Sequence, residues 1–247
     1  MSGHSKWHNI KIKKQRVDLV RGKLFSKVSR EIMVAAKEGG GNPDANMRLR
    51  AAIERAREAG MPSDNIHRAV ARGSGELAGA DYESVVYEGY APGGVAVLVE
   101  ALTDNRNRTA SEVRAVFTRH GGNLGGGSVA WMFERQGTVT AERGTLSEDD
   151  FLLAALEAGG EDVHTTDEAF EVLTAPEAAF KVKQALEARG VTVSGTEIRM
   201  HPRNTVRVEG KEAQQVLRLL DALEDLDDVA NVHANFDIPD EILQQVG

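Results

Sequence analysis

Residues 136–199 alternate between strand-like and helix-like segments in an order that few folds accommodate. The hydrophobic patterns predict a strand over 136–141, a helix over 148–158, strands over 162–166 and 170–174, a helix over 177–189 and a strand over 191–199. The order βαββαβ is that of the split-βαβ, or ferredoxin-like, motif. It predicts that residues 135–203 form an α/β sandwich inserted into the rest of the chain.

The segments on either side of this insertion contain further strand and helix patterns. Before it we predict strands over 85–90, 95–102 and 129–133 with a helix over 109–120, and after it strands over 205–209 and 229–236 with a helix over 214–223. Neither set is a complete sandwich by itself. We therefore expect residues 80–134 and 204–247 to join into one discontinuous α/β domain.

The first third of the chain has helical periodicity. Apolar residues recur at intervals of three and four from 15 to 38, a Gly-rich break follows at 39–46, and further helices are predicted up to residue 58 and over 66–71. Asp44 is the predicted N-cap of the second helix. The predicted fold class is therefore α+β: an N-terminal three-helix domain (residues 1–75) followed by two α/β sandwich domains, the middle one discontinuous.

Charge is distributed unevenly along the chain. Residues 1–75 contain 16 Lys and Arg against 7 Asp and Glu, whereas the whole chain has a net charge of −8. A basic end attached to an acidic remainder is typical of a chain that meets a polyanion at that end. The alternative is a set of solvated helix faces with uneven charge. We prefer the polyanion and treat residues 1–75 as the candidate nucleic-acid-binding domain.

The sequence offers little for catalysis or metal binding. Cysteine is absent, which excludes disulfides and thiolate chemistry, and His4 and His8 lack a third ligand nearby. The stretch 121–128, GGNLGGGS, lacks the Lys of a phosphate-binding loop and follows a helix, so a tight connection is the preferred interpretation. The acidic stretch 224–228 is most simply a solvated turn. We predict no enzymatic activity, no metal, no cofactor and no small-molecule substrate.

Three stretches are the predicted nucleic-acid contacts. The N-terminal arm supplies cations and an aromatic ring for stacking, the second helix carries a series of arginines, and a polar loop at 103–108 opens a helix with two arginines. The alternatives are a docked Trp, a solvated helix face and an ordinary N-cap loop. The predicted contact residues are Lys6, Trp7, His8, Lys11, Lys13, Lys14, Arg16, Arg48, Arg50, Arg55, Arg106 and Arg108.

The same stretches resemble the signature segments of a known family. GHSKWHNIKIKK, GGNPDANMRLRAAIERAREAGMPSDNI, YEGYAPGGVAVLVEALTDNRNRTASEVR and HGGNLGGGSVAWMFERQG are similar to segments of the YebC/PmpR family, whose mitochondrial relatives include a translational activator of cytochrome oxidase. The resemblance implies a helical bundle with two α/β domains, a cytoplasmic location and no catalysis. It also implies a transcriptional regulator or a factor that acts on the ribosome, including in elongation through proline-rich stretches.

These observations favour a non-enzymatic, cytoplasmic, nucleic-acid-binding regulator of gene expression, with DNA as its first expected partner. The alternative is a ribosome-associated translation factor whose arm contacts rRNA or tRNA. A third hypothesis is a protein-interaction scaffold that uses the acidic domains. No run of 18 apolar residues is present, so no membrane partner is expected.

Overall fold

The structure, a computed structural model, describes residues 18–144, 147–165 and 169–239, with side chains from residue 22 onward. The chain divides into two compact units, residues 1–132 with 202–247 and residues 133–201. The sequence-based division into three domains stays a prediction. No helix in the described ranges is long and apolar enough to cross a membrane.

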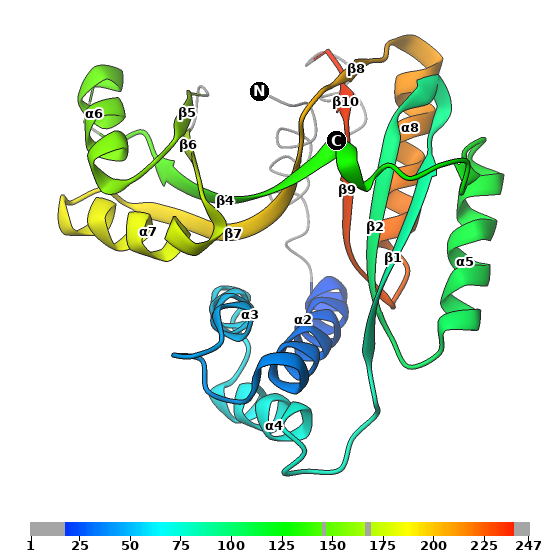
Figure 1. Cartoon of the computed structure of the whole chain (residues 1–247), viewed down its shortest axis with the longest axis horizontal. Coiled ribbons are helices and arrows are strands. Elements are labelled where there is room, and N and C mark those ends of the chain that lie inside the picture. Colours follow the sequence, from blue (N-terminus) through cyan, green and yellow to red (C-terminus); the bar gives the residue numbers. More distant parts are fainter. Residues whose placement is uncertain (1–17, 145–146, 166–168, 240–247) are drawn as a thin grey trace. The chain divides into compact units, whose positions relative to one another are not determined.

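The first unit begins with three helices, α2 (Asp18–Gly39), α3 (Met47–Glu58) and α4 (Ser63–Gly73), drawn in blue to cyan in Figure 1. Their apolar stripes meet in one small core that includes Val28, Ile32, Leu49, Ile53 and Ile66. Gly73 allows the close crossing of α4 and α2, because a Cβ at this position would lie 2.3 Å from the Met33 carbonyl oxygen. The predicted N-terminal helical region is confirmed.

The start of α3 differs from the prediction. Asn46, not Asp44, is the N-cap, and its side-chain oxygen accepts a hydrogen bond from the Leu49 amide at 3.0 Å. The Asn46 amide group also donates to the Ala35 and Gly40 carbonyl oxygens at 2.8 and 2.9 Å. Asparagine suits this position because its amide group can both accept and donate hydrogen bonds, whereas an ionised carboxylate can only accept them.

The rest of the first unit is an antiparallel sheet covered on one face by two helices. Its strand order is β3 (Asn123–Leu124), β1 (Glu83–Tyr90), β2 (Ala96–Thr103) and β9 (Val229–Ala234). The helices α5 (Arg106–Arg119) and α8 (Gly210–Glu224) pack against it (Figure 1), and their buried side chains share one core with Val97, Val99 and Val232. A separate parallel pair joins β8 (Val206–Arg207) to β10 (Phe236–Asp237).

The strand predicted over 129–133 is wrong. Residues Ala130–Met132 form a 3-10 turn (η2), and the strand β4 starts only at Phe133. The amides of Val129 and Ala130 both donate to the Glu88 carboxylate, so they are not available to a strand ladder. The β-branched and aromatic residues of this stretch favour a strand, but the hydrogen bonds to Glu88 on β1 hold it in a turn instead.

The second unit has the predicted ferredoxin-like topology. The strands β4 (Phe133–Glu142), β5 (Asp162–Thr165), β6 (Ala169–Thr174) and β7 (Val193–Pro202) have the order β5-β6-β4-β7. In each crossover a third strand lies between the two that the helix connects, as in a split βαβ motif. The helices α6 (Glu148–Ala158) and α7 (Ala179–Ala188) close the core, in which the Phe151 and Phe170 rings stack at 4.0 Å.

Candidate nucleic-acid interface

One basic face of α2 is occupied within the molecule. Lys23, Lys27 and Arg30 recur at intervals of four and three, which places them on one side of the helix. The Lys27 ammonium donates to the Glu224 and Val229 carbonyl oxygens at 2.6 and 2.7 Å. Lys23 and Arg30 donate to the carbonyl oxygens of Asp225 and Asp227.

These contacts satisfy the end of another helix. The last carbonyl groups of an α-helix have no partner inside the helix, and α8 ends at Glu224. Cations at a helix C-terminus are favoured by both hydrogen bonding and the helix dipole. Burial of the Lys27 ammonium, together with the nearby charge of Lys23, lowers the pKa of Lys27 to about 8. The carboxylates of Glu224, Asp225 and Asp227 act in the opposite direction but do not outweigh the burial. The basic face of α2 is therefore an internal docking surface.

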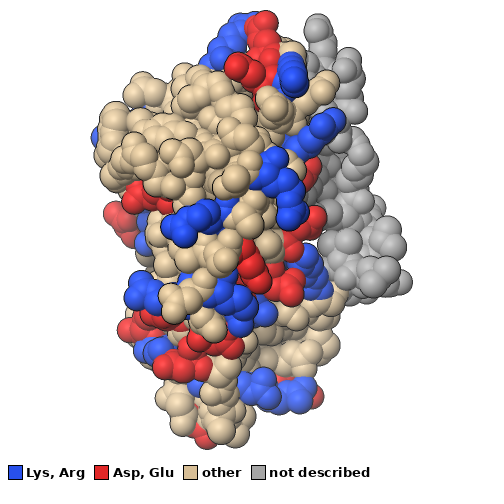
Figure 2. Space-filling view, turned by 90° about the vertical axis from the view of Figure 1, so that its right-hand side faces the viewer, with Lys and Arg blue, Asp and Glu red and all other residues tan. Residues whose placement is uncertain are grey.

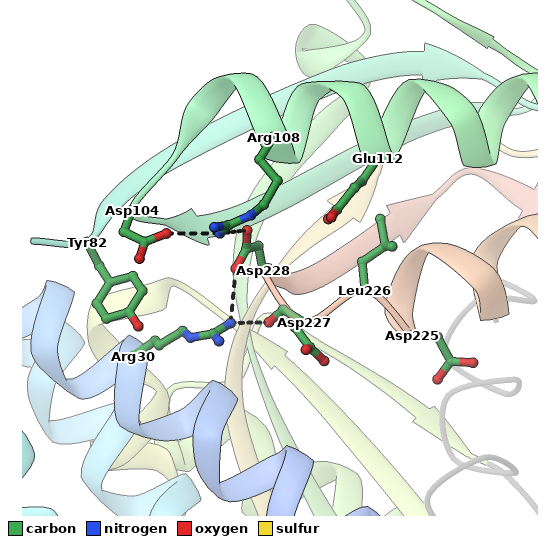
Figure 3. Close-up of a pocket in the computed structure, with 9 residues that line it drawn as sticks. All are labelled: Arg30, Tyr82, Asp104, Arg108, Glu112, Asp225, Leu226, Asp227 and Asp228. Carbon is green, nitrogen blue, oxygen red and sulfur yellow. Dashed lines mark hydrogen bonds and ion pairs between the residues drawn. The ribbon is translucent and has the colours of Figure 1, made fainter. Parts of the chain in front are cut away.

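Asp228 is the centre of a second set of contacts (Figure 3). Its side chain is 5% exposed and accepts hydrogen bonds from Arg108 at 2.6 Å and from the Thr109 hydroxyl at 2.7 Å, while Arg30 lies 3.3 Å away. Burial raises the pKa of this carboxyl, but the hydrogen bonds from Arg108 and Thr109 and the charges of both arginines outweigh it and lower the pKa. Asp228 thus joins α2, α5 and the loop before β9.

The surface around Asp228 is hollowed but acidic. A cavity of about 530 Å³ is lined by two cations and five carboxylates, together with Tyr82 and Leu226; the charged residues are Arg30, Arg108, Asp104, Glu112, Asp225, Asp227 and Asp228. The two arginines point toward Asp228, and Asp104 also accepts from Arg108 (Figure 3). Because acids outnumber bases here, the cavity is a poor place for a phosphate. Among the described residues, no group of three His, Cys, Asp or Glu is arranged to hold a metal ion.

The arginines predicted on α3 also have partners within the bundle. Arg55 lies 2.9 Å from the Glu31 carboxylate, and Arg48 pairs with Glu38. Arg50 donates to the Pro43 and Asp44 carbonyl oxygens at 3.1 and 2.9 Å. These arginines connect α3 to α2 and to the turn between them.

The other predicted contact residues divide into two groups. Arg106 is 64% exposed and lies 3.5 Å from Glu83, so it is the most exposed of the predicted arginines that lie in the described ranges. Seven predicted residues lie outside the described part of the chain: Lys6, Trp7, His8, Lys11, Lys13, Lys14 and Arg16. The structure therefore brings Arg108 together with Arg30, which was not predicted, and it does not gather the predicted arginines of the described ranges into one site.

Comparison with known proteins identifies the chain's relatives. The family description "TACO1/YebC protein N-terminal domain" matches residues 5–76, and "TACO1/YebC second and third domain" matches residues 82–236. The chain belongs to the TACO1/YebC family. Proteins named "Probable transcriptional regulatory protein" from Dictyoglomus turgidum and Aquifex aeolicus are each 55% identical to it over the full length of both chains.

A solved structure agrees with the fold of this YebC-family chain. The crystal structure of a conserved hypothetical protein from Aquifex aeolicus is 54% identical, with a TM-score of 0.83 over 93% of this chain and 95% of that one. Because the match covers 93% of this chain, it includes residues of both units.

Two features of this YebC-family protein were not found from its sequence. The acidic stretch 224–228 is not simply a solvated turn, because Asp228 is buried and hydrogen-bonded. Trp131 was expected in a strand but is 64% exposed on the 3-10 turn η2. Neither feature could be found from the local pattern. The burial of Asp228 depends on partners more than 100 residues away, and the turn that carries Trp131 depends on hydrogen bonds to the Glu88 carboxylate.

Proposed function

We propose that this YebC-family protein is a non-enzymatic regulator of gene expression that binds nucleic acid chiefly through the cations of residues 1–17. The names of its relatives support a regulator, and DNA is the partner that a transcriptional regulator would bind. The charge distribution of residues 1–75 supports a role in nucleic-acid binding for residues 1–17 and a mainly structural role for the cations of the helices.

The observation that carries this proposal is that most cations of the helical bundle already have partners within the chain. Residues 22–75 contain ten Lys and Arg, of which eight have a carboxylate, carbonyl or amide oxygen of the chain as partner: Lys23, Lys27, Arg30, Lys37, Arg48, Arg50, Arg55 and Arg68. Residues 1–17 contain five Lys and Arg and no Asp or Glu. The largest uncompensated positive charge in the sequence is therefore in the arm.

Other surfaces are less suited to a polyanion. Residues 133–201 contain 14 acids and 6 bases, so this unit repels phosphate. On the face that Figure 2 shows, Lys and Arg side chains alternate with Asp and Glu side chains. Such a face offers no continuous track for a nucleic-acid backbone.

A second candidate function is a translation factor that contacts RNA, and one observation favours it. The helix α4 carries His67, Arg68 and Arg72, which are residue types that read bases, but Arg68 donates back to the Asp64 carbonyl at 3.3 Å and to the Asn65 side chain at 2.5 Å. Reading of duplex DNA requires side chains directed at base edges in the major groove. Lysines with an aromatic ring instead suit backbone contact and stacking on unpaired bases, which RNA offers.

The test measures binding of the full-length protein to duplex DNA, to single-stranded RNA and to ribosomes as a function of salt. For duplex DNA, log affinity should fall linearly with log salt by about 0.9 per phosphate contact. Changing Lys11, Lys13 and Lys14 to alanine should reduce that slope by up to about 3. A specificity ratio for DNA below about 10³, with saturable ribosome binding, would favour the translation factor.

The control removes the same amount of charge elsewhere. Lys181, Lys211 and Arg218 are exposed side chains for which the described residues provide no ion-pair partner, so their triple alanine variant should bind as the wild type does. Equal losses from both triple variants would contradict the assignment to the arm. Absence of binding to all three partners would contradict the proposed function itself.

A further inference from the structure

Trp131 is exposed to a degree that is unusual for an indole. It lies on η2, and at 64% it is the most exposed large apolar side chain in the described part of the chain. A single exposed apolar side chain is common on protein surfaces, so the groups around Trp131 decide whether it marks a binding site. The function proposed above does not yet use this residue.

Hydrogen bonds fix the position of the indole. The Trp131 Nε1–H donates to the Ser128 carbonyl oxygen at 3.0 Å, which holds the ring over its own turn. The Ser128 hydroxyl donates to the Glu88 carboxylate at 2.8 Å, and the amides of Val129 and Ala130 donate to the same carboxylate oxygen. Since Glu88 belongs to β1, the turn that carries Trp131 is anchored to the sheet.

The loop before the indole presents free backbone amides. Gly125, Gly126 and Gly127 all have positive φ, and a Cβ built at Gly125 or Gly127 would meet no other atom within 4 Å. The Gly125 amide donates to the Glu88 carbonyl oxygen at 2.8 Å. The next three amides, of Gly126, Gly127 and Ser128, have no acceptor among the described residues.

The other end of the turn is also held by a backbone hydrogen bond. The Arg203 amide donates to the Met132 carbonyl oxygen at 2.8 Å. An aromatic ring to stack on and unpaired backbone amides to donate to phosphate are groups that proteins use to hold a nucleotide of a single strand.

We infer that Trp131 and the loop 125–128 form a second nucleic-acid contact, which binds one nucleotide of an unpaired strand. The base stacks on the indole face, and the phosphate oxygens accept from the free glycine amides. A base within a duplex is already stacked and paired, so the site distinguishes single strands from duplexes. This inference rests on the proposed function, because it adds a contact for unpaired strands to the nucleic-acid binding proposed for residues 1–17.

The experiment uses the fact that the chain has only two tryptophans, Trp7 and Trp131. In full-length protein carrying Trp7→Phe, the indole fluorescence reports on Trp131 alone. Mixed-sequence 12-nucleotide probes of DNA and of RNA are titrated, each as a single strand and as a duplex. We expect saturable quenching by the single strands and little quenching by the duplexes.

Affinities for the same probes are then compared across variants. Trp131→Ala should weaken single-strand binding by about 5- to 150-fold, the effect of losing one stacked base, and change duplex binding by less than about twofold. Trp131→Phe keeps an aromatic face and should retain most of the affinity. Leu153→Ala is the control, because Leu153 is 61% exposed in the other unit and should have no effect.

The outcomes separate the two proposals. Single-strand binding that leaves Trp131 fluorescence unchanged and is equal in wild type and Trp131→Ala would overturn the Trp131 site but leave the proposed function standing. Failure of the wild type to bind any probe or a ribosome would overturn the proposed function. An unchanged urea unfolding midpoint in Trp131→Ala ensures that a loss of binding is not a loss of folding.

Discussion

The Arg108 guanidinium donates a hydrogen bond of 2.6 Å to the Asp228 carboxylate, although 120 residues separate them in the sequence. The same carboxylate lies 3.3 Å from Arg30, so one buried acid connects the helical bundle to the sandwich of the first unit. Arg108, which the sequence predicts as a nucleic-acid contact, thus also takes part in holding these two parts of the first unit together.

Replacing Asp228 by Asn should destabilise the first unit. The variant removes the charge that faces two arginines, and breaking a buried ion pair costs about 3–5 kcal/mol. Because Arg108 is 44% exposed, water replaces part of the lost interaction, and we expect about 2–3 kcal/mol in urea unfolding. Asp225→Asn is the control: its side chain is 82% exposed and should change stability by less than about 0.5 kcal/mol.

Lys27 should make stability increase with pH in the alkaline range. Its pKa is about 8 in the folded state and 10.5 when unperturbed, so between these values the unfolded state binds the extra proton. The free energy of unfolding then rises with pH, by at most about 1.4 kcal/mol per pH unit. Urea unfolding of wild type and Lys27→Met should show a stability difference that is flat below pH 7.5 and shifts in favour of the wild type above pH 8. Parallel curves up to pH 10 would contradict the shifted pKa.

Gly73→Ala should destabilise the bundle, whereas Gly22→Ala should not. A Cβ at Gly73 would lie 2.3 Å from the Met33 carbonyl oxygen and 2.8 Å from the Ala36 Cβ, so α4 must move away from α2 at a cost of about 1–3 kcal/mol. Gly22 lies in α2 with nothing within 4 Å of a Cβ, and alanine there should stabilise by about 0.5–1 kcal/mol. Thermal unfolding should move the two midpoints in opposite directions.

Alanine substitution at Asn46 and at Asp44 distinguishes the observed cap of α3 from the predicted one. Asn46→Ala leaves the Leu49 amide and two carbonyl oxygens without their partner and should cost about 2 kcal/mol. The Asp44 side chain is 94% exposed, so Asp44→Ala should cost less than about 0.5 kcal/mol. A larger effect at Asp44 would show that the helix starts where the sequence pattern indicated.

Elements whose signal is local were predicted well. The helix predicted over 148–158 has the same limits as α6, and the order βαββαβ corresponds to the sheet of the second unit. The period of apolar residues is a property of the segment itself, because a helix or strand must direct its own apolar face toward the core. The same reasoning found α2, α3 and α4, with shifts of a few residues at the ends for which the structure describes the neighbouring residues.

Elements that depend on a distant partner were predicted wrongly. Val129 and Ala130 belong to a turn because Glu88 accepts hydrogen bonds from their amides, and nothing in residues 129–133 encodes that carboxylate. Asp228 looked like one acid among several, and only the fold brings Arg30, Arg108 and Thr109 to it.

The sequence by itself therefore determined most of the helices and strands, the fold class and the concentration of positive charge at the N-terminal end. The tertiary structure decided which cations are engaged within the protein, since ion pairs such as Arg55 with Glu31 and Arg108 with Asp228 form between segments far apart in the chain. It also decided that Trp131 faces solvent. The physical reason is that periodicity and charge are local properties, whereas burial and hydrogen-bond partners exist only after the chain has folded.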